Sequence, residues 1–257
     1  IHGLEGCDRS AYLLSTGELA YRMGWNVVRM NMRGCGDGLT ICARLYHSGV
    51  STDLLAVLEW LAQNTDRIAV CGFSLSANLT LLALARHKDR IPRNVCGAVA
   101  VCPPIDLAAC ADALARRRNR LYQYYYMGKL KRSYRIRQAL RPDLYAPGLE
   151  GPPRNVREYD DAIVARYGGF RDADDYYARS SAGPLLRQLE HPVLMISPVN
   201  DPMIPIESVK RWPLSSSVTA EFTKSGGHVG FVGRTRAPGS FWAAERAIEF
   251  LDAQAND

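Results

Sequence analysis

The sequence lacks any long uninterrupted apolar stretch, and none of its runs approaches the roughly 18–20 residues that a helix needs to span a bilayer. Its seven cysteines contain no Cys-x-x-Cys pair, which excludes zinc-ribbon and thioredoxin-like sites. An odd number of scattered cysteines, several in apolar runs, is typical of free thiols that pack as small hydrophobic side chains. We therefore expect reduced thiols and a cytoplasmic protein.

The opening residues, IHGLEG, contain neither an initiator Met nor a basic segment followed by an apolar leader. They are typical of a strand end and the loop after it, so we expect the chain to begin inside a fold. The 257 residues are 47% hydrophobic and 23% charged, which is ordinary globular composition and excludes a disordered or fibrous chain. This length suits one large domain or two small ones.

Acidic residues are absent from residues 113–142, which contain ten Lys or Arg and five Tyr. The rest of the chain has 22 basic and 26 acidic residues, so this segment alone produces the net charge of +6. A basic helix with interleaved aromatics can lie on an anionic membrane, follow nucleic-acid phosphates, or form a solvated lid whose Arg stems cover apolar surface. We favour the lid, keep peripheral contact with an anionic membrane as the alternative, and expect no nucleic-acid partner.

Short apolar strands alternate with helical patterns along the chain. Strands are predicted at 25–31, 67–73, 97–104, 192–201 and 218–227, and helices at 9–23, 51–63, 74–87 and 241–253. Because the strands are nearly continuous apolar runs, we expect a mostly parallel sheet buried on both faces, in an α/β fold. Residues 1–104 and 186–257 would form its core, and residues 105–185 a helical cap or lid insertion over the C-terminal edge of the sheet.

Gly72-Phe73-Ser74-Leu75-Ser76 lies between a predicted strand and a predicted helix. This is the pattern of a nucleophile elbow, a tight turn that exposes the Ser hydroxyl at the top of the sheet. The residues two before and two after the Ser must be small, because strand and helix backbones crowd there. Gly72 meets this need, and Ser76 replaces the usual Gly but is still small. We predict that Ser74 is a nucleophile.

A nucleophilic Ser needs a base, and the base needs an orienting acid. On this fold the acid and then the His follow the Ser along the chain. Asp201 ends one predicted strand, and His228 lies on a Gly-rich loop directly beyond the next. We therefore predict the triad Ser74–Asp201–His228, with Asp106, which follows the preceding strand, as the alternative acid.

An oxyanion hole requires two backbone N–H groups. One would come from Leu75, at a helix N-terminus where the dipole favours negative charge. The other would come from Leu4, in the loop His2-Gly3-Leu4, and His2 is expected to orient that loop without acting as a base. This chemistry requires no metal and no organic cofactor.

Several strings resemble the YheT-like branch of the α/β-hydrolases, whose animal relatives are abhydrolase-domain lipases and esterases. They are HGLEG (2–6), NMRGCG (31–36), RLYHSG (44–49), GFSLSAN (72–78), GFRDADDYYARSS (169–181), NDPMIP (200–205) and GGHVGF (226–231). The resemblance extends over nearly the whole chain and implies hydrolysis of carboxylic esters, with Ser74, Asp201 and His228 at the family's triad positions. It also implies that relatives have two or three further strands before HG, so that Ile1 would end the third strand. Ser76 departs from the Gly that is usual at its position.

The sequence thus predicts a serine hydrolase of small-molecule acyl esters of short or medium chain, with glycerolipids or phospholipids next, acting through an acyl-enzyme. Two alternatives stay open. A hydrolase fold could bind a lipid or a partner without turnover. A thioesterase or an acyltransferase would use the same triad with a different acyl donor or acceptor.

Overall fold

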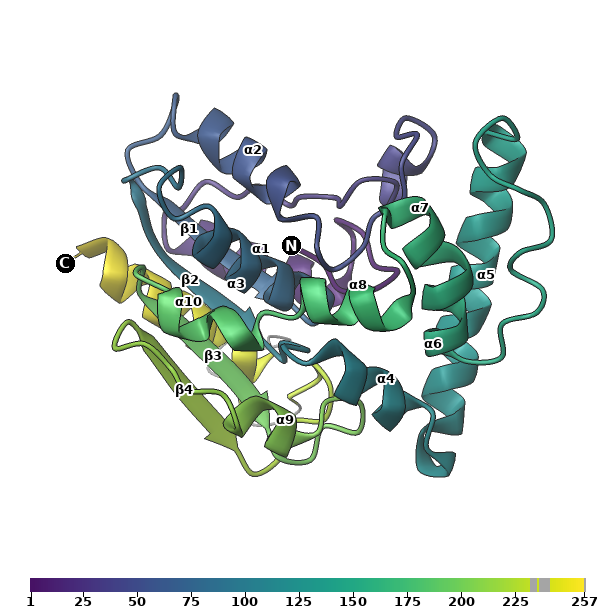
Figure 1. The fold of residues 1–257 in the computed structure, drawn as a ribbon. Coiled ribbons are helices and arrows are strands. Elements are labelled where there is room, and N and C mark those ends of the chain that lie inside the picture. The colour runs from purple at the N-terminus through teal and green to yellow at the C-terminus, as the bar shows by residue number, and fades with distance from the viewer. Residues whose placement is uncertain (232–234, 236–240, 257) are drawn as a thin grey trace.

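Four parallel strands form one sheet in the order β1 (Ile68–Phe73), β2 (Val95–Val101), β3 (Val193–Pro198) and β4 (Val218–Thr223) (Figure 1). The computed structural model describes residues 1–231, 235 and 241–256. All six residues of β3 are buried, as expected of an apolar strand covered on both faces. The predicted parallel α/β fold is confirmed.

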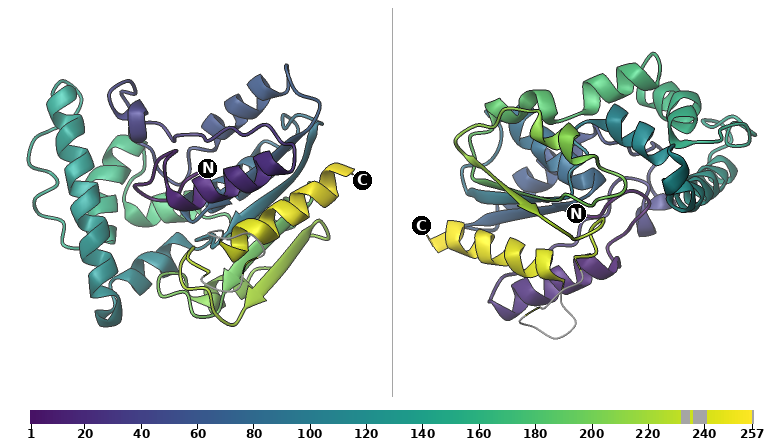
Figure 2. Two further views of the ribbon diagram at one scale, coloured as in Figure 1. Left: turned by 180° about the vertical axis from the view of Figure 1, so that it is seen from behind. Right: turned by 90° about the horizontal axis from the view of Figure 1, so that it is seen from below.

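Helices cover both faces of this sheet. α1 (Ala11–Arg22) and α10 (Trp242–Asn256) lie side by side on one face, and α2 (Ser51–Leu61) and α3 (Leu75–Arg86) lie on the other (Figure 2). α3 is buried at every residue from Leu75 to Ala85, because it packs against β1 and β2 beneath α2. This burial fixes the position of the α3 N-terminus, where Ser74 lies.

The chain between β2 and β3 forms helices grouped on the side toward which the strands run (Figure 1). These elements are α4 (Leu107–Leu114), η2 (Arg117–Asn119), α5 (Arg120–Leu140), α6 (Val156–Tyr159), the π-helical turn η3 (Asp160–Ala165), α7 (Arg166–Gly168), α8 (Ala173–Ser180) and η4 (Gly183–Gln188). Two short helices lie elsewhere, η1 (Gly36–Leu39) and α9 (Ile206–Lys210).

Arg137 of α5 is buried, although it belongs to the basic segment 113–142. Its guanidinium donates to the carbonyl oxygens of Gly34, Cys42 and Arg44, at 3.1, 3.0 and 3.3 Å. One of the ten basic residues therefore holds a loop against the helix and is not part of a solvated face.

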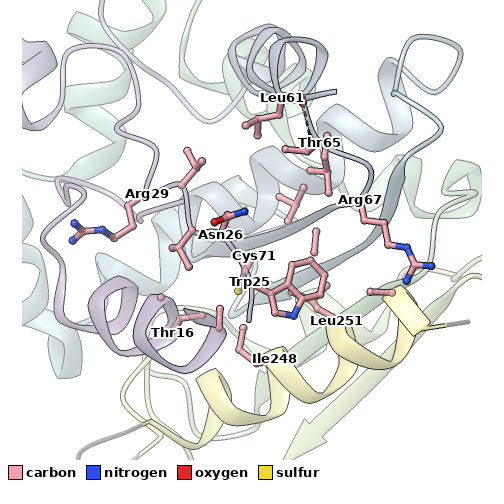
Figure 3. Close-up of a pocket in the computed structure, with 18 of the residues that line it drawn as sticks. Thr16, Trp25, Asn26, Arg29, Leu61, Thr65, Arg67, Cys71, Ile248 and Leu251 are labelled. Carbon is pink, nitrogen blue, oxygen red and sulfur yellow. Dashed lines mark hydrogen bonds between the residues drawn. The ribbon is translucent and has the colours of Figure 1, made fainter. Parts of the chain in front are cut away.

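The prediction of a strand at 25–31 is wrong. The segment makes no strand pairing, and Val27 and Val28 are 39% and 57% exposed. A cavity of about 640 Å³ lies between this segment and β1, and Trp25, Asn26 and Cys71 are among the residues that line it (Figure 3). Paired strands lie about 4.8 Å apart, and no described residue beyond Ile1 occupies that position beside β1. A β-branched pattern alone does not make a strand where no neighbour accepts its hydrogen bonds.

Ile1 is bound to the free edge of β1. Its amino group donates to the Cys71 carbonyl at 2.7 Å, and its own carbonyl accepts from the Phe73 amide at 3.2 Å. These two bonds have the alternation of a parallel strand pair. They bring the residues that follow Ile1 to the C-terminal end of the sheet.

His2 is completely buried beside this edge. Its Nε2 accepts from the Met32 amide at 3.1 Å, and its Nδ1 lies 2.8 Å from the Gly3 carbonyl oxygen, to which it donates. Both ring nitrogens are therefore used by the neutral imidazole. Burial lowers the pKa of His2 to about 4, because the charged form would be desolvated.

The neutral His2 predicts a loss of stability in acid. Between the ordinary pKa of 6.5 and the folded value near 4, the unfolded chain binds a proton that the folded chain does not, so stability falls as pH falls. The free energy of unfolding should drop by about 2 kcal/mol from this residue alone between about pH 7.5 and 5.

Urea unfolding at about pH 7.5 and 5 measures this contribution. His2→Asn should lose less stability between the two pH values than the unsubstituted chain. His87→Asn, at a half-buried surface position, is the control and should follow the unsubstituted chain more closely. Equal losses in His2→Asn and the unsubstituted chain would contradict the assignment.

Candidate active site

Ser74 occupies a strained turn between β1 and α3. Its φ and ψ are 53° and −120°, a combination that residues other than glycine rarely adopt. Its amide donates to the Val101 carbonyl of β2 at 2.8 Å, which ties the turn to the neighbouring strand. A Cβ at Gly72 would lie 2.6 Å from both Ser76 O and Thr80 Oγ1, so only glycine fits where strand and helix approach.

Ser76, the departure from the usual Gly, is buried and its hydroxyl is used. Its Oγ accepts from the Phe73 amide at 2.9 Å and donates to the Ile1 carbonyl at 2.7 Å. The serine side chain therefore fits within the turn and connects it to the first residue of the chain.

The structure brings Ser74, His228 and Asp201 together from the ends of β1, β4 and β3. His228 Nε2 lies 2.8 Å from Ser74 Oγ, and His228 Nδ1 lies 2.8 Å from Asp201 Oδ2. The side chains of His228 and Asp201 are 10% and 1% exposed. The second carboxylate oxygen of Asp201 accepts from the amides of Met203 and Ile204, at 2.8 and 3.1 Å. These bonds leave the carboxylate little freedom to turn away from the imidazole.

Asn200 joins the two loops that contain the acid and the histidine. Its side-chain oxygen accepts from the amides of Gly226 and Gly227, both at 3.0 Å. Because Asp201 follows Asn200 and His228 follows Gly227, these two bonds set the spacing between the carboxylate and the imidazole.

Asp106, the alternative acid, is engaged elsewhere. It caps α4 by accepting from the Ala109 amide at 3.2 Å, and it forms an ion pair with Arg211. His228 Nδ1 bonds Asp201 instead.

The two predicted oxyanion donors lie beside Ser74. Leu4 and Leu75 line the same cavity as Ser74 and His228. Leu75 begins α3, so its amide has no acceptor within the helix, and the Leu4 amide donates to no described residue. Gly3 packs against the turn, since a Cβ there would lie 3.0 Å from Ser74 Cβ. Among the described residues neither N–H group has an acceptor, and both residues line the cavity beside Ser74.

Sequence reasoning missed Cys102, which directly follows β2 and has a φ of 50°. Its sulfur, a carboxylate oxygen of Asp201 and a ring nitrogen of His228 lie within 4.8 Å of one another, the one such trio in the described chain that could hold a metal ion. Burial and the nearby Asp201 raise the pKa of this thiol well above its ordinary value, and both ring nitrogens of His228 already bond Asp201 and Ser74. We therefore interpret Cys102, Asp201 and His228 as a group of hydrogen-bonded side chains and not as a metal centre.

A cavity of about 100 Å³ opens beside Ser74 and His228, between the strand ends and the helices that follow β2. Its wall is largely apolar and includes Leu107, Leu114, Leu130, Val156, Met203 and Ile204. Sequence reasoning predicted a helical cap at 105–185 over this edge of the sheet, but it did not identify Asp160 and Tyr177, which also line this cavity.

Comparisons with known proteins identify the family of this chain. The model of the alpha/beta hydrolase family matches residues 1–241. The chain is 34% identical over 255 residues to YheT of Escherichia coli (strain K12), covering 97% of this chain and 74% of that protein. It is 26% identical over 238 residues to Phospholipase ABHD3 of Homo sapiens, covering 90% of this chain and 57% of the human protein.

Among solved structures, the Pyrococcus furiosus esterase Pf2001 has a TM-score of 0.60 and 19% sequence identity, covering 98% of this chain and 81% of that one. At this identity the similarity concerns the fold alone. The family match and the identity to YheT confirm the resemblance drawn from the sequence motifs, and the chain therefore belongs to the alpha/beta hydrolase family.

Proposed function

We propose that the chain is a serine esterase that hydrolyses small-molecule acyl esters of short or medium chain. The observation that supports this is the hydrogen-bonded series from Ser74 through His228 to Asp201, at the edge of an apolar cavity. Relatives named as a phospholipase and as a monoacylglycerol lipase support ester substrates, with glycerolipids or phospholipids as the next class.

In this mechanism Ser74 Oγ attacks the ester carbonyl carbon while His228 Nε2 takes the hydroxyl proton. Asp201 holds the imidazole by Nδ1 and stabilises the imidazolium. The N–H groups of Leu4 and Leu75 donate to the oxygen of the tetrahedral intermediate. His228 then protonates the leaving alcohol, and an acyl-enzyme remains on Ser74. Water deprotonated by His228 releases the carboxylic acid and restores the hydroxyl.

Two other functions would use the same fold. A non-catalytic binding protein would keep the cavity but leave Ser74 unreactive toward a fluorophosphonate, which labels only an activated serine. A thioesterase would prefer a thioester donor, and an acyltransferase would prefer an alcohol acceptor to water. The hydrogen bond of 2.8 Å between Ser74 Oγ and His228 Nε2 favours a reactive serine over a binding protein.

We also propose that the outer face of α5 contacts an anionic membrane. Leu121 and Tyr124 are 84% and 83% exposed on this face, and Arg116, Arg117 and Arg118 are exposed just before it. Exposed apolar and aromatic side chains beside a group of cations are typical of a helix that lies in the membrane interface. Among the described helices, none combines the length and hydropathy needed to cross a membrane.

Ser74→Ala should lower kcat for 4-nitrophenyl butanoate at least about 10³-fold, because it removes the attacking oxygen. It should also abolish fluorophosphonate labelling. The control is Ser225→Ala, an exposed serine on the loop that contains His228, which should retain both properties. Equal rates for the unsubstituted chain and Ser74→Ala would refute the proposal.

Asp201→Asn should lower kcat about 10³–10⁴-fold, because the amide cannot stabilise the imidazolium and favours the wrong tautomer of His228. Asp106→Asn is the matched control. It removes the ion pair with Arg211, so its unfolding temperature should fall while kcat stays within about threefold of the unsubstituted value. The opposite ranking of the two variants would reassign the acid to Asp106.

If α5 contacts membranes, the protein should sediment with vesicles of anionic phospholipid but not with vesicles of neutral phospholipid. Reversing Arg116, Arg117 and Arg118 to Glu should weaken binding to anionic vesicles at least about tenfold, since each cation near the surface contributes about 1 kcal/mol. Reversing the exposed Arg67, Arg93 and Arg187, which precede β1, β2 and β3, makes the same change in net charge and should weaken binding less. Equal loss in both triple variants would argue against α5 as the contact.

A further inference from the structure

A buried acid lies on the wall of the cavity beside Ser74. Asp160 begins the π-helical turn η3, lines the same cavity as Ser74 and His228, and is only 9% exposed. π-helical turns are frequent at functional sites, where they displace a side chain from regular helical spacing. The esterase mechanism assigns no step to Asp160, so its burial needs a separate explanation.

The hydrogen bonds of Asp160 are incomplete. Its Oδ2 accepts from the Tyr177 hydroxyl at 2.7 Å, whereas its Oδ1 has no donor among the described residues. Oδ1 keeps some solvent-accessible surface, because it is not one of the described side-chain atoms that are both fully enclosed and without a partner. Burial raises the pKa of Asp160 to about 7, and the bond from Tyr177 and the charge of Arg157 only partly oppose this. Above this pKa the carboxylate has one oxygen ready to accept a further hydrogen bond.

The surroundings of Asp160 favour a neutral donor over a cation. The Arg157 guanidinium lies 5.0 Å from the centroid of the Tyr177 ring, but it pairs with Asp112 and Asp174 and does not donate to Asp160. The rest of the wall is largely apolar and would not solvate an ammonium group. A hydroxyl group requires only one acceptor, and Oδ1 supplies it.

Resting on the proposed esterase function, we infer that Asp160 and Tyr177 form a polar subsite that binds a hydroxyl group of the ester substrate. The enzyme then prefers short esters with a hydroxyl group to their unsubstituted counterparts. The cavity of about 100 Å³ is smaller than an engineered cavity of roughly 150 Å³ that admits benzene, which limits the group it holds to a few carbons. The hydroxyl belongs either to the acyl chain or to the alcohol.

Two matched pairs of esters separate these sources. Comparing kcat/KM for 4-nitrophenyl 3-hydroxybutanoate and 4-nitrophenyl butanoate tests a hydroxyl group in the acyl chain. Comparing kcat/KM for 2-hydroxyethyl butanoate and propyl butanoate, measured by release of the acid, tests a hydroxyl group in the alcohol. One pair should show a preference of about tenfold in kcat/KM for the hydroxylated ester, as expected for one hydrogen bond to a buried carboxyl group.

Asp160→Leu should reduce this preference to near unity. Leu has the branched shape of Asp but no polar atom, so the substrate hydroxyl finds neither an acceptor nor a donor at this position. Asp161→Asn is the control, because Asp161 is exposed, accepts from the Ala173 amide at 3.0 Å, and does not line the cavity. It should leave the preference and the basal rate unchanged.

Equal kcat/KM values within both pairs for the unsubstituted enzyme would overturn the subsite, whether or not Asp160→Leu folds. Proportional loss for both members of a pair in Asp160→Leu would also overturn it, because a purely structural role lowers both rates alike. Hydrolysis of no ester, with no fluorophosphonate labelling of Ser74, would instead overturn the proposed function on which the subsite rests.

Discussion

The close approach of β1 to α3 at Ser74 is the constraint on which the site depends. A buried helix starts immediately after a buried strand, so the residue between them is held in a conformation that costs about 1–3 kcal/mol. The turn persists because strong packing surrounds it: the α3 helix is enclosed, Ser74 is tied to Val101, and Ser76 bonds both the strand and Ile1. This conformation orients the hydroxyl of Ser74 toward His228 and leaves the Leu75 amide without an acceptor.

Backbone strain is concentrated around this site. Five residues of the described chain other than glycine have positive φ, and all lie in the segments at the strand ends: Glu5, Ser74, Cys102, Val229 and Phe231. Strain of this kind is retained where surrounding contacts overdetermine the backbone, and it is common at functional sites. The result is that side chains from three strands meet at hydrogen-bond distance, although their loops are far apart in the sequence.

The helices after β2 complete the site from the other side. Tyr126 and Leu130 of α5 line the cavity, while Leu121 and Tyr124 of the same helix face solvent. Arg137 fixes the helix to the loop at 34–44, which limits how far the wall of the cavity can shift. One helix therefore presents an apolar lining to a substrate and an aromatic, basic surface to the outside.

The sequence by itself predicted the parallel α/β fold, the turn at Ser74 and the placement of Ser74 and His228 at strand ends, because these depend on local crowding and on chain order. It left Asp106 open beside Asp201. Only the tertiary structure showed that Asp201 bonds His228, that 25–31 is not a strand, that Arg137 is buried and that Asp160 lines the cavity. Strand pairing and the burial of a charged group depend on which distant residues lie alongside, and a pattern read along one chain does not contain that information.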